Sequence, residues 1–533
     1  MIKECVRPWW RRYDLVRCVC LVAVACALPE AACGSSSAGR DGDGGTQAEG
    51  GPDSSGGAGV GSAGSSSSGR GSSGTPGTGN AGASSDGASG GPGTASDGGL
   101  PGSSGVFGGD GGACAISAAS VRVTEIDVGI AYSYQEVDTP LSLLAISPIP
   151  SGGSRLAFMG GDGMVHVARL DAGDKLVAAS VFGLPASDFE DIVADDLGGV
   201  VLLSRSAMGG GTLQCGTPSN LCGTPPSPPI PCNDMYMVRF NDSAEAWATK
   251  LTTSSAQLPP YSTGPSGPPV YMIWWYAHNG RLASDGTNFA AYYGSAVSVS
   301  QGGCVNIHQG DEMRVVDPAG RTLTGGFDWG CSHSAFERMT WDGTKYVTVC
   351  NNDSDPGGSK TGQMAFAPNL TTIYPVNEVN AELGAVIQAG SGGYWLVLSD
   401  VRPGQSTVAP ALDDVHLVHT TAGMSDKDIT LASDTGLNDR APHLAAFGSH
   451  RMLAAWETST MTDHLVQTDT SRRLYVQALD SATGGALGAP YNVAGVRGSR
   501  YQDFRRYPDD SVAYAAPGST GTKIKIVRIT PCP

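Results

Sequence analysis

The chain has 533 residues and carries 50 Asp and Glu against 33 Lys and Arg, a formal net charge of −17. This acidic balance argues against nucleic acid and against electrostatic binding to anionic lipid, because both need Lys and Arg to neutralise phosphate. The length allows several domains, but low-complexity composition in the first part restricts the folded region to about 420 residues.

Residues 1–33 have the pattern of an export signal. Five basic side chains precede an apolar run from Cys18 to Leu28, which is too short to cross a bilayer as a helix. Without this segment the chain has 33 − 5 = 28 basic and 50 − 3 = 47 acidic residues, a net charge of −19. We expect export, followed by either lipid anchoring or plain secretion.

Two cysteines, Cys26 and Cys33, follow small residues of the kind that precede a lipoprotein cleavage site. Cleavage before Cys33 leaves that residue and eight further cysteines, an even number that suits four disulfides in an oxidising compartment. The count favours lipidation at Cys33, with Cys26 as the alternative. Residues 34–113 consist almost entirely of Gly, Ser, Ala, Asp, Thr and Pro, which predicts a disordered tether with a span of roughly 50 Å.

From residue 114 to 533 the sequence predicts an all-β fold. The segment Asp285-Gly286-Thr287 returns as Asp342-Gly343-Thr344, and the period is 342 − 285 = 57 residues. Seven such units can be followed, each with short alternating strands separated by Gly, Asp or Asn turns. A period of this size with β-rich units favours a seven-bladed β-propeller of four-stranded antiparallel blades.

The ends of this region predict how the ring closes. The seventh unit lacks a fourth strand, whereas Ser120–Val128 is a strand left over at the front. Pairing of Ser120–Val128 with Ile524–Ile529 would complete the last blade and remove two free sheet edges. That pairing would bring Cys114 close to Cys532, so we expect a disulfide between them.

Histidines in the loops of the third and fourth units are candidate ligand or metal residues. His278 and His333 enter two successive inner strands, and His308 and Asp311 are placed in the loop between the second and third strands of the third unit. Three imidazoles and a carboxylate form a chemically reasonable zinc or copper set, although loop histidines also serve structural roles. Cys304 and Cys331 occupy the same two loops and are expected to form a disulfide.

Further candidate residues enter later units on the same face. Arg440 and His443 precede the sixth inner strand, and arginines there could hold an anionic ligand or pair with the many acids. Five acidic residues surround the second inner strand and are interpreted as a solvated rim, with a glycosidase-like carboxylate pair as the alternative: Asp188, Glu190, Asp191, Asp195 and Asp196. The predicted ligand-binding residues are therefore His278, His333, Arg440 and His443.

The signal, Cys33, the Gly/Ser-rich tether and the propeller together resemble the surface lipoproteins of myxobacteria and similar high-GC Gram-negative bacteria. The resemblance implies a monomeric envelope protein that reaches the membrane only through its lipid. No catalytic motif is present, which favours a binding module for an extracellular glycan, peptide or protein over an enzyme. The alternative is a secreted hydrolase or lyase that uses His278, His308 and His333, with a metal as its only expected cofactor.

Overall fold

The computed structural model of the chain describes most of the region after residue 112. The described ranges are 113–135, 143–206, 213–214, 231–252, 270–274, 280–301, 304–332, 336–353, 362–377, 381–402, 412–434, 436–461, 465, 468–498 and 500–532. The chain divides into two units, residues 1–96 and 97–533, and all described residues belong to the second. The signal, Cys26, Cys33 and nearly all of the tether lie outside them. Within the described ranges no helix has the length and apolarity needed to cross a membrane.

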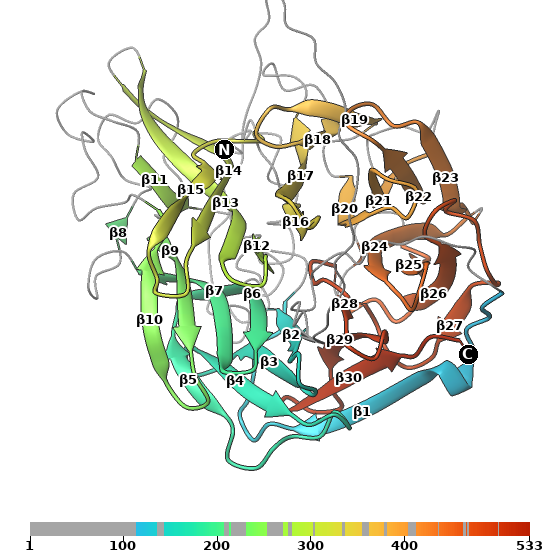
Figure 1. Cartoon of the computed structure of the whole chain (residues 1–533), viewed down its shortest axis with the longest axis horizontal. Helices are drawn as coiled ribbons and strands as arrows, with labels where there is room; N and C mark the ends of the chain where they lie inside the picture. Colours follow the sequence, from blue (N-terminus) through green and yellow to red (C-terminus); the bar gives the residue numbers. More distant parts are fainter. Residues whose placement is uncertain are drawn as a thin grey trace, which may run out of the picture. The chain divides into compact units, whose positions relative to one another are not determined.

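The described strands form seven antiparallel blades of four strands, as predicted (Figure 1). Blade 1 contains β2 (Leu144–Pro148), β3 (Ser154–Met159), β4 (Met164–Leu170) and β5 (Phe182–Pro185). Blade 2 contains β6 (Asp188–Asp195), β7 (Gly198–Ser206), β9 (Pro231–Phe240) and β10 (Glu245–Lys250). Blade 3 contains β12 (Gly280–Ser284), β13 (Phe289–Gln301), β14 (Cys304–Val316) and β15 (Thr322–Phe327). Blade 4 contains β16 (Arg338–Trp341), β17 (Tyr346–Asp353), β18 (Gly362–Phe366) and β19 (Thr371–Val376).

The remaining three blades follow in chain order. Blade 5 contains β20 (Glu382–Gln388), β21 (Tyr394–Val401), β22 (Asp413–Thr420) and β23 (Lys427–Ala432). Blade 6 contains β24 (Asn438–Ala446), β25 (Arg451–Ser459), β26 (Arg473–Asp480) and β27 (Tyr491–Val493). Blade 7 contains β28 (Arg505–Arg506), β29 (Val512–Pro517), β30 (Lys523–Ile529) and, from the front of the chain, β1 (Val121–Asp127), which follows a short 3-10 helix, Ala118–Ser120.

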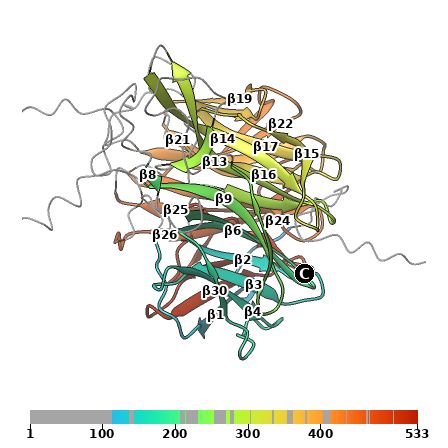
Figure 2. The same cartoon turned by 90° about the vertical axis from the view of Figure 1, so that its left-hand side faces the viewer.

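The first strand of each blade lies on the inside of a closed ring. In chain order β2 contacts β6, then the contacts run through β12, β16, β20 and β24 to β28, and β28 contacts β2 again. Figures 1 and 2 show the sheets arranged around this inner circle of strands from two directions. The starts of seven inner strands, far apart in the sequence, are therefore brought to one axis.

Blades 2 and 3 share one sheet, whereas each of the other five blades forms a sheet of its own. The added strand β11 (Val270–Trp274) pairs with β13 through Val270–Met272 and with β9 through Ile273 and Trp274. A two-residue strand, β8 (Leu213–Gln214), also pairs with β9. The two blades are joined into one ten-stranded sheet, because the long strands β9 and β13 extend beyond the blade and leave edges for β11 to pair with.

The predicted closure of the ring is confirmed. β1 pairs with β30 antiparallel, from Val121 opposite Ile529 to Asp127 opposite Lys523. Cys114 and Cys532 form the expected disulfide, with their Cα atoms 5.3 Å apart. The N-terminal strand thus supplies the outer strand of blade 7 and protects its edge.

The repeated Asp-Gly-Thr segments are the tight turns between the first and second strands of blades 3 and 4. The carboxylate of Asp285 accepts the N–H of Thr287 at 2.8 Å, and Asp342 does the same for Thr344 at 2.8 Å. Gly286 and Gly343 both have φ of +92°, a conformation that strongly favours glycine. The sequence repeat therefore encodes one turn structure twice.

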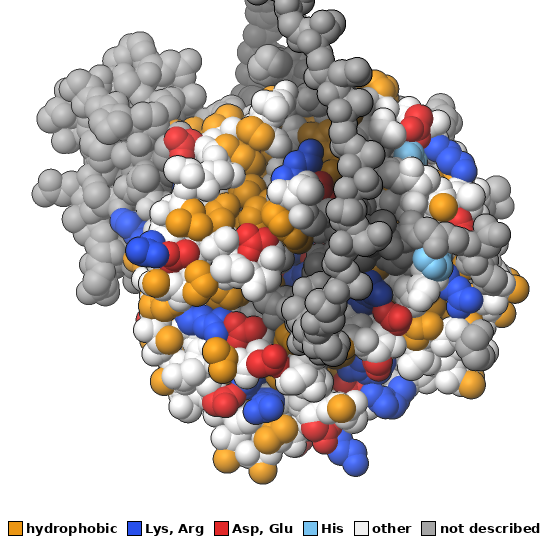
Figure 3. All heavy atoms as spheres, in the orientation of Figure 1, with side chains coloured by type: hydrophobic (Ala, Val, Ile, Leu, Met, Phe, Trp, Pro, Cys, Tyr) orange, Lys and Arg blue, Asp and Glu red, His pale blue; other side chains and the backbone are white. Residues whose placement is uncertain are grey.

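Apolar side chains fill the spaces between neighbouring blades. Leu156 and Phe158 of blade 1 belong to one buried cluster with Ile526 of blade 7, and Trp395 of blade 5 packs in a cluster with Trp456 of blade 6. On the face in Figure 3, acidic and basic side chains are interspersed and no single charge dominates a large patch of the coloured surface. The core is thus a set of interfaces between sheets that holds the inner strands rigidly around the axis.

Candidate ligand site at the propeller axis

Charged side chains from six blades meet where the inner strands begin. We name this group the axial cluster; its members are Asp188, Glu190, Asp191, Arg281, Glu337, Arg338, Glu382, Arg440, His443, Arg500, Asp503 and Arg505. All are buried except Asp503 and Arg505, which are half-buried. So many ionisable groups in a protein interior are unusual, and they require mutual pairing or a bound partner.

Two ion pairs show that the cluster spans the axis. Arg281 Nε of blade 3 donates to Asp503 Oδ1 of blade 7 at 2.9 Å. Arg505 Nη2 of blade 7 donates to Asp191 Oδ2 of blade 2 at 2.5 Å. Blade 7 adjoins blades 6 and 1 in the ring, so contacts with blades 2 and 3 must pass through its centre.

β-bulges in three inner strands shape the cluster. In β6 the pairing passes from Phe189 opposite Leu203 to Asp191 opposite Leu202, which leaves Glu190 as the extra residue. Similar register shifts occur in β20 after Leu383 and in β24 between Arg440 and His443. A bulge redirects a side chain from its ordinary alternation, and here the three bulges lie at the axis.

Glu382 is the anionic centre of one half of the cluster. Its Oε1 lies 2.5 Å from Arg500 Nε and 3.1 Å from Arg440 Nε, and its Oε2 accepts the N–H of Ala441 at 2.7 Å. Burial alone would raise the pKa of Glu382, but Arg500 and Arg440 outweigh it and lower the pKa to about 2. Glu382 is therefore ionised at any physiological pH.

Asp503 has the same role in the other half. Burial would raise its pKa, but Arg281, Arg505 and Arg338 lower the pKa of Asp503 to about 2. Arg505 Nη2 lies 3.4 Å from Asp503 Oδ2, in addition to its bond with Asp191. Two permanently charged carboxylates thus anchor the arginines of the axis.

Glu190 and His443 have no such anchoring. Glu190 is 1% exposed, and neither of its carboxyl oxygens has a hydrogen-bond partner among the described residues. Burial and the neighbouring Asp188 raise the pKa of Glu190 well above its ordinary value, so its neutral form is favoured. His443 is 1% exposed and stacks on Phe504 with ring centroids 4.3 Å apart. Within the described part of the chain neither of its ring nitrogens has a hydrogen-bond partner. Burial and the nearby Arg338 lower the pKa of His443 to about 3, which keeps the imidazole neutral.

Two arginines also keep unused hydrogen-bonding capacity. Arg338 donates from Nε to Gly384 O at 2.6 Å and from Nη1 to Glu337 O at 2.9 Å, while its Nη2 has no partner in the ranges that the structure describes. Arg281 Nη2 is likewise without a partner. Burial, followed by the charge of Arg281, lowers the pKa of Arg338 to about 9, because the two cations lie close together. Buried polar atoms without partners are rare, and several at one place favour a ligand site.

The structure brings two of the predicted ligand-binding residues, Arg440 and His443, into this cluster. Arg440 pairs with Glu382 and with Asp413, whose Oδ2 is 3.0 Å from Arg440 Nε. Of the two roles predicted for this arginine, binding an anionic ligand or pairing with acidic side chains, the structure shows the second. His278 and His333 lie outside the described residues, and their ligand and metal roles stay predictions. The prediction of a solvated rim is wrong for Asp188, Glu190 and Asp191, which are buried at the axis. It holds for Asp196, which is exposed, and Asp195 is half-buried.

His308 and Asp311 lie on strand β14 and not in a loop, because β13 and β14 continue as one ladder to Gln301 opposite Cys304. Asp311 is buried, and its carboxylate accepts the hydroxyl of Tyr292 at 2.6 Å and the N–H of Cys331 at 2.8 Å. These bonds give Asp311 a structural role between blades 3 and 4.

The expected disulfide between Cys304 and Cys331 is wrong. Cys331 is bonded to Cys350 of β17, with Cα atoms 6.4 Å apart. Ser332, next to Cys331, bridges to Gly310, whereas Cys304 lies six residues farther along β14, about 20 Å away at the rise of a strand. Asp311, Cys331 and Cys350 lie close enough to suggest a metal site, but both sulfurs are used by the disulfide.

Sequence reasoning missed most of the axial cluster. Arg281, Glu337, Arg338, Glu382 and Asp503 carried one shared signal, a charged residue at or just before the start of an inner strand. This pattern becomes informative only when the starts of the seven inner strands are known to lie together at the axis. The bulge in β6 that places Glu190 at the axis corresponds to no recognisable pattern in the sequence.

The chain is similar to several solved structures at low sequence identity. An α-L-arabinofuranosidase from Fusarium graminearum is 10% identical, with 76% of this chain and 97% of that chain covered and a TM-score of 0.37. The WD40 domain of coronin from Toxoplasma gondii is 8% identical, with 79% and 89% covered and a TM-score of 0.38. A protein of unknown function from Dyadobacter fermentans is 11% identical, with 77% and 99% covered and a TM-score of 0.35.

These similarities are too distant to transfer a site or an activity to this chain. No known protein family matches the sequence. No curated protein matches it either.

Proposed function

We propose that this chain is an exported binding module whose ligand contacts the axial cluster. The observation that carries the proposal is the set of buried polar atoms without partners, on Glu190, His443, Arg281 and Arg338. Leaving such atoms unpaired costs about 1–3 kcal/mol each, and a ligand that pairs with them recovers that free energy. Their coexistence at one axis favours a bound partner over four unrelated defects.

The chemistry of these atoms favours a glycan or a peptide side chain rich in hydroxyl or carbonyl groups. The Nη2 groups of Arg281 and Arg338 offer hydrogen-bond donors, and a neutral Glu190 offers both a donor and an acceptor. The neutral imidazole of His443 likewise offers one donor and one acceptor. A flat protein surface could not reach groups that are this deeply buried, so a small or extended ligand is the better fit.

A hydrolase or lyase is the second candidate, and one observation favours it. Burial raises the pKa of Glu190 well above its ordinary value, while neighbouring arginines lower the pKa of Asp503 and of Glu382 to about 2 in the same cluster. Carboxyl groups whose pKa values are separated in this way can divide the roles of proton donor and base between them. Under this alternative Glu190 is the proton donor.

Replacing Glu190 with Gln tests both candidates. We expect Glu190→Gln to weaken ligand binding about tenfold, in a binding screen of the purified protein on glycan and peptide arrays followed by titration. The free protein should be as stable as wild type or more stable, because the substitution removes a buried acid without a partner. Loss of function together with unchanged stability marks a ligand-contacting residue and not a structural one.

The control is Glu245→Gln, the same substitution at a surface ion pair with Arg205. Binding without turnover, lost in Glu190→Gln, identifies a module; release of reducing sugar or unsaturated product, lost in Glu190→Gln, identifies an enzyme. Ligand titrations that are identical in Glu190→Gln and wild type would remove the axial cluster from consideration.

The envelope location is part of the proposal and rests on the sequence of residues 1–33. We expect radiolabelled palmitate to be incorporated in cells that express the chain, and incorporation to vanish in Cys33→Ser. Cys26→Ser is the matched control, since it removes the competing cysteine. Labelling that persists in Cys33→Ser and disappears in Cys26→Ser would assign the anchor to Cys26, and no labelling in the wild type would favour plain secretion.

A further inference from the structure

The surroundings of Glu190 are mainly acidic. Asp188 and Asp191 lie on either side of it in β6, and Glu337 acts on it electrostatically from the start of blade 4. Arg281 of β12 is the described cation that acts on it most strongly. Three carboxyl groups and one guanidinium group therefore determine the electrostatic field at Glu190, and such a field favours a further positive charge.

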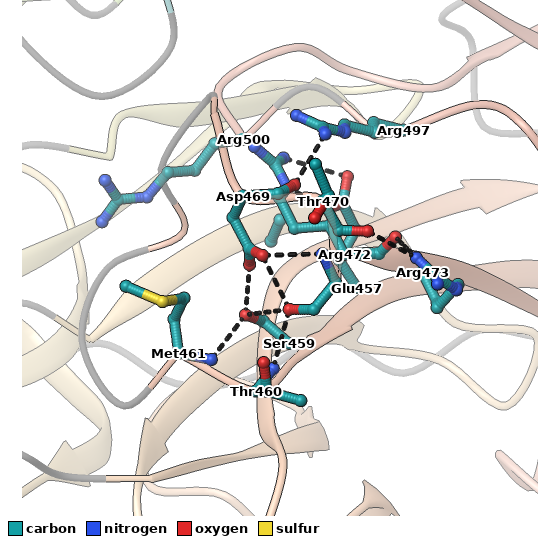
Figure 4. Close-up of polar contacts among 12 residues, drawn as sticks. Glu457, Ser459, Thr460, Met461, Asp469, Thr470, Arg472, Arg473, Arg497 and Arg500 are labelled. Atoms are coloured by element: carbon teal, nitrogen blue, oxygen red, sulfur yellow. Dashed lines mark hydrogen bonds and ion pairs between the residues drawn. The ribbon is translucent and has the colours of Figure 1, made fainter.

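A buried carboxylate elsewhere in the chain has an arginine of its own. In blade 6 both oxygens of the buried Glu457 accept hydrogen bonds from Arg472, from Nε at 2.5 Å and from Nη2 at 3.1 Å (Figure 4). Glu190 is 1% exposed, yet both of its oxygens are without a hydrogen-bond partner within the ranges that the structure describes. Because an unpartnered buried carboxyl group costs free energy, a ligand that pairs with Glu190 recovers it.

Acidic groups also outnumber basic ones over the whole axis. The axial cluster has six carboxyl and five guanidinium groups, and Asp413, which lies 3.0 Å from Arg440, adds a seventh carboxyl group. The imidazole of His443 adds no charge, since burial lowers its pKa to about 3. Among the described residues the axis is thus short of positive charge, and either a proton on Glu190 or a cation beside it supplies one.

The spacing of the axial carboxyl groups does not favour a metal ion. A metal ion needs at least three ligand atoms around one point. In the described part of the chain, the His, Cys, Asp and Glu atoms close enough for this belong to Asp311, Cys331 and Cys350, and none of these is in the axial cluster. An ammonium group has no such requirement, because it brings three N–H donors of its own and can bond one carboxylate and further acceptors separately.

We propose that the ligand of the axial site carries an ammonium group and that the carboxylate of Glu190 binds it. The inference rests on the proposed function and names the chemical class of the ligand at the same site. An ammonium at the end of an unbranched stem, as in a lysine side chain, can reach a group as deep as Glu190, and an amino sugar carries the same group on its ring. The net charge of −17 adds a long-range attraction for such a ligand.

Binding of an ammonium group should release a proton. Burial and the neighbouring Asp188 raise the pKa of Glu190 well above its ordinary value, so the carboxyl group of the free chain is neutral. A bound ammonium favours the ionised carboxylate, and the proton of Glu190 passes to the buffer. Affinity should therefore rise with pH, up to about tenfold per pH unit, while the pH is below the pKa of Glu190. A ligand that offers only hydroxyl groups should not show this dependence.

Titration calorimetry of the purified full chain with two pairs of compounds tests the proposal. The pairs are Nα-acetyl-lysine amide with its Nε-acetylated form, and glucosamine with N-acetylglucosamine. We expect an ammonium compound to bind and its acetylated partner to bind about tenfold more weakly or not at all, because acetylation removes the charge. Titrations in two buffers of different ionisation enthalpy should show the release of about one proton. Tighter binding of the lysine compound identifies a peptide as the source of the ammonium, and tighter binding of glucosamine identifies a glycan.

A matched pair of variants completes the experiment. Glu190→Gln should weaken binding of the ammonium compound about tenfold and abolish the proton release, whereas Glu245→Gln, at the surface pair with Arg205, should change neither. The proposal is overturned if neither ammonium compound binds, if acetylated compounds bind equally well, if no proton is released, or if Glu190→Gln binds fully. The proposed function is judged separately: it survives such a result if a neutral ligand from the arrays loses affinity in Glu190→Gln, and it fails if that ligand binds Glu190→Gln as it binds wild type.

Discussion

Replacing Glu382 with Gln is expected to lower the free energy of unfolding by about 3–5 kcal/mol at neutral pH. Glu382 neutralises both Arg500 and Arg440 within the buried axis, and it accepts the N–H of Ala441. Glutamine keeps the size and one carbonyl acceptor but removes the charge, so two buried guanidinium groups lose their shared counter-ion. Urea unfolding of wild type and variant at pH 7, followed by tryptophan fluorescence, measures the change.

The same residue predicts how stability depends on pH. The pKa of Glu382 is lowered from 4.5 to about 2 in the folded chain. A lowered pKa means that its contribution is complete above the unfolded value and is lost as pH falls from about 4.5 toward 2. We therefore expect the stability difference between wild type and Glu382→Gln to narrow by about 2 kcal/mol between pH 7 and pH 3.

Glu245→Gln is the matched control for this prediction as well. Glu245 pairs with Arg205 at 2.7 Å on the surface, where an ion pair contributes about 0–1 kcal/mol. If Glu245→Gln and Glu382→Gln both lowered the free energy of unfolding by the same small amount, the axial ion pairs would add little to stability. A difference between wild type and Glu382→Gln that stays constant from pH 7 to pH 3 would contradict the lowered pKa.

Removal of the disulfide between Cys114 and Cys532 is expected to produce the second large loss of stability. The disulfide joins residues 418 positions apart and links the front of the chain to its end. In the chain-entropy model, closing so long a loop stabilises the fold by about 6 kcal/mol. Cys114→Ser should therefore lower the urea midpoint and expose blade 7, since β1 depends on its pairing with β30.

A double-mutant comparison isolates this effect from the loss of one side chain. Cys532→Ser should be destabilised as much as Cys114→Ser, and the double variant should be no worse than either, because all three lack the same bond. The rate of amide hydrogen exchange should rise most in β1 (Val121–Asp127) and β30 (Lys523–Ile529), the two paired strands beside the disulfide. If Cys114→Ser had the urea midpoint of wild type and unchanged hydrogen exchange in those strands, strand pairing alone would be enough to close the ring.

Secondary structure and ring closure were readable from local patterns in the sequence. Ile524–Ile529 is predicted as a strand from the sequence, and β30 covers Lys523–Ile529. The Asp-Gly-Thr turns follow from a carboxylate that binds the next N–H groups and a glycine that accepts positive φ, both local effects. Even the pairing of β1 with β30 followed from an unpaired strand at each end and a cysteine beside each.

The partner of Cys331 illustrates where local patterns fail. Cys304 was assigned to it because both lay in loops expected on one face. The structure continues β13 and β14 as a paired ladder, which carries Cys304 away and leaves Cys350 of β17 beside Cys331. Strand length beyond the blade depends on cross-strand partners such as β11, and sequence alternation does not specify those partners.

The sequence by itself determined that the chain forms an all-β ring of seven blades closed by its own first strand, because alternation, turn residues and strand number are properties of short segments. Only the tertiary structure decided that Glu190, Arg281, Glu382, His443 and Asp503 form one buried cluster. These residues are spread over more than 300 positions, and each alone looks like an ordinary charged or polar residue near a strand end. Their burial, their shifted pKa values and their unpaired atoms arise from convergence at an axis, which exists only when all seven inner strands are in place.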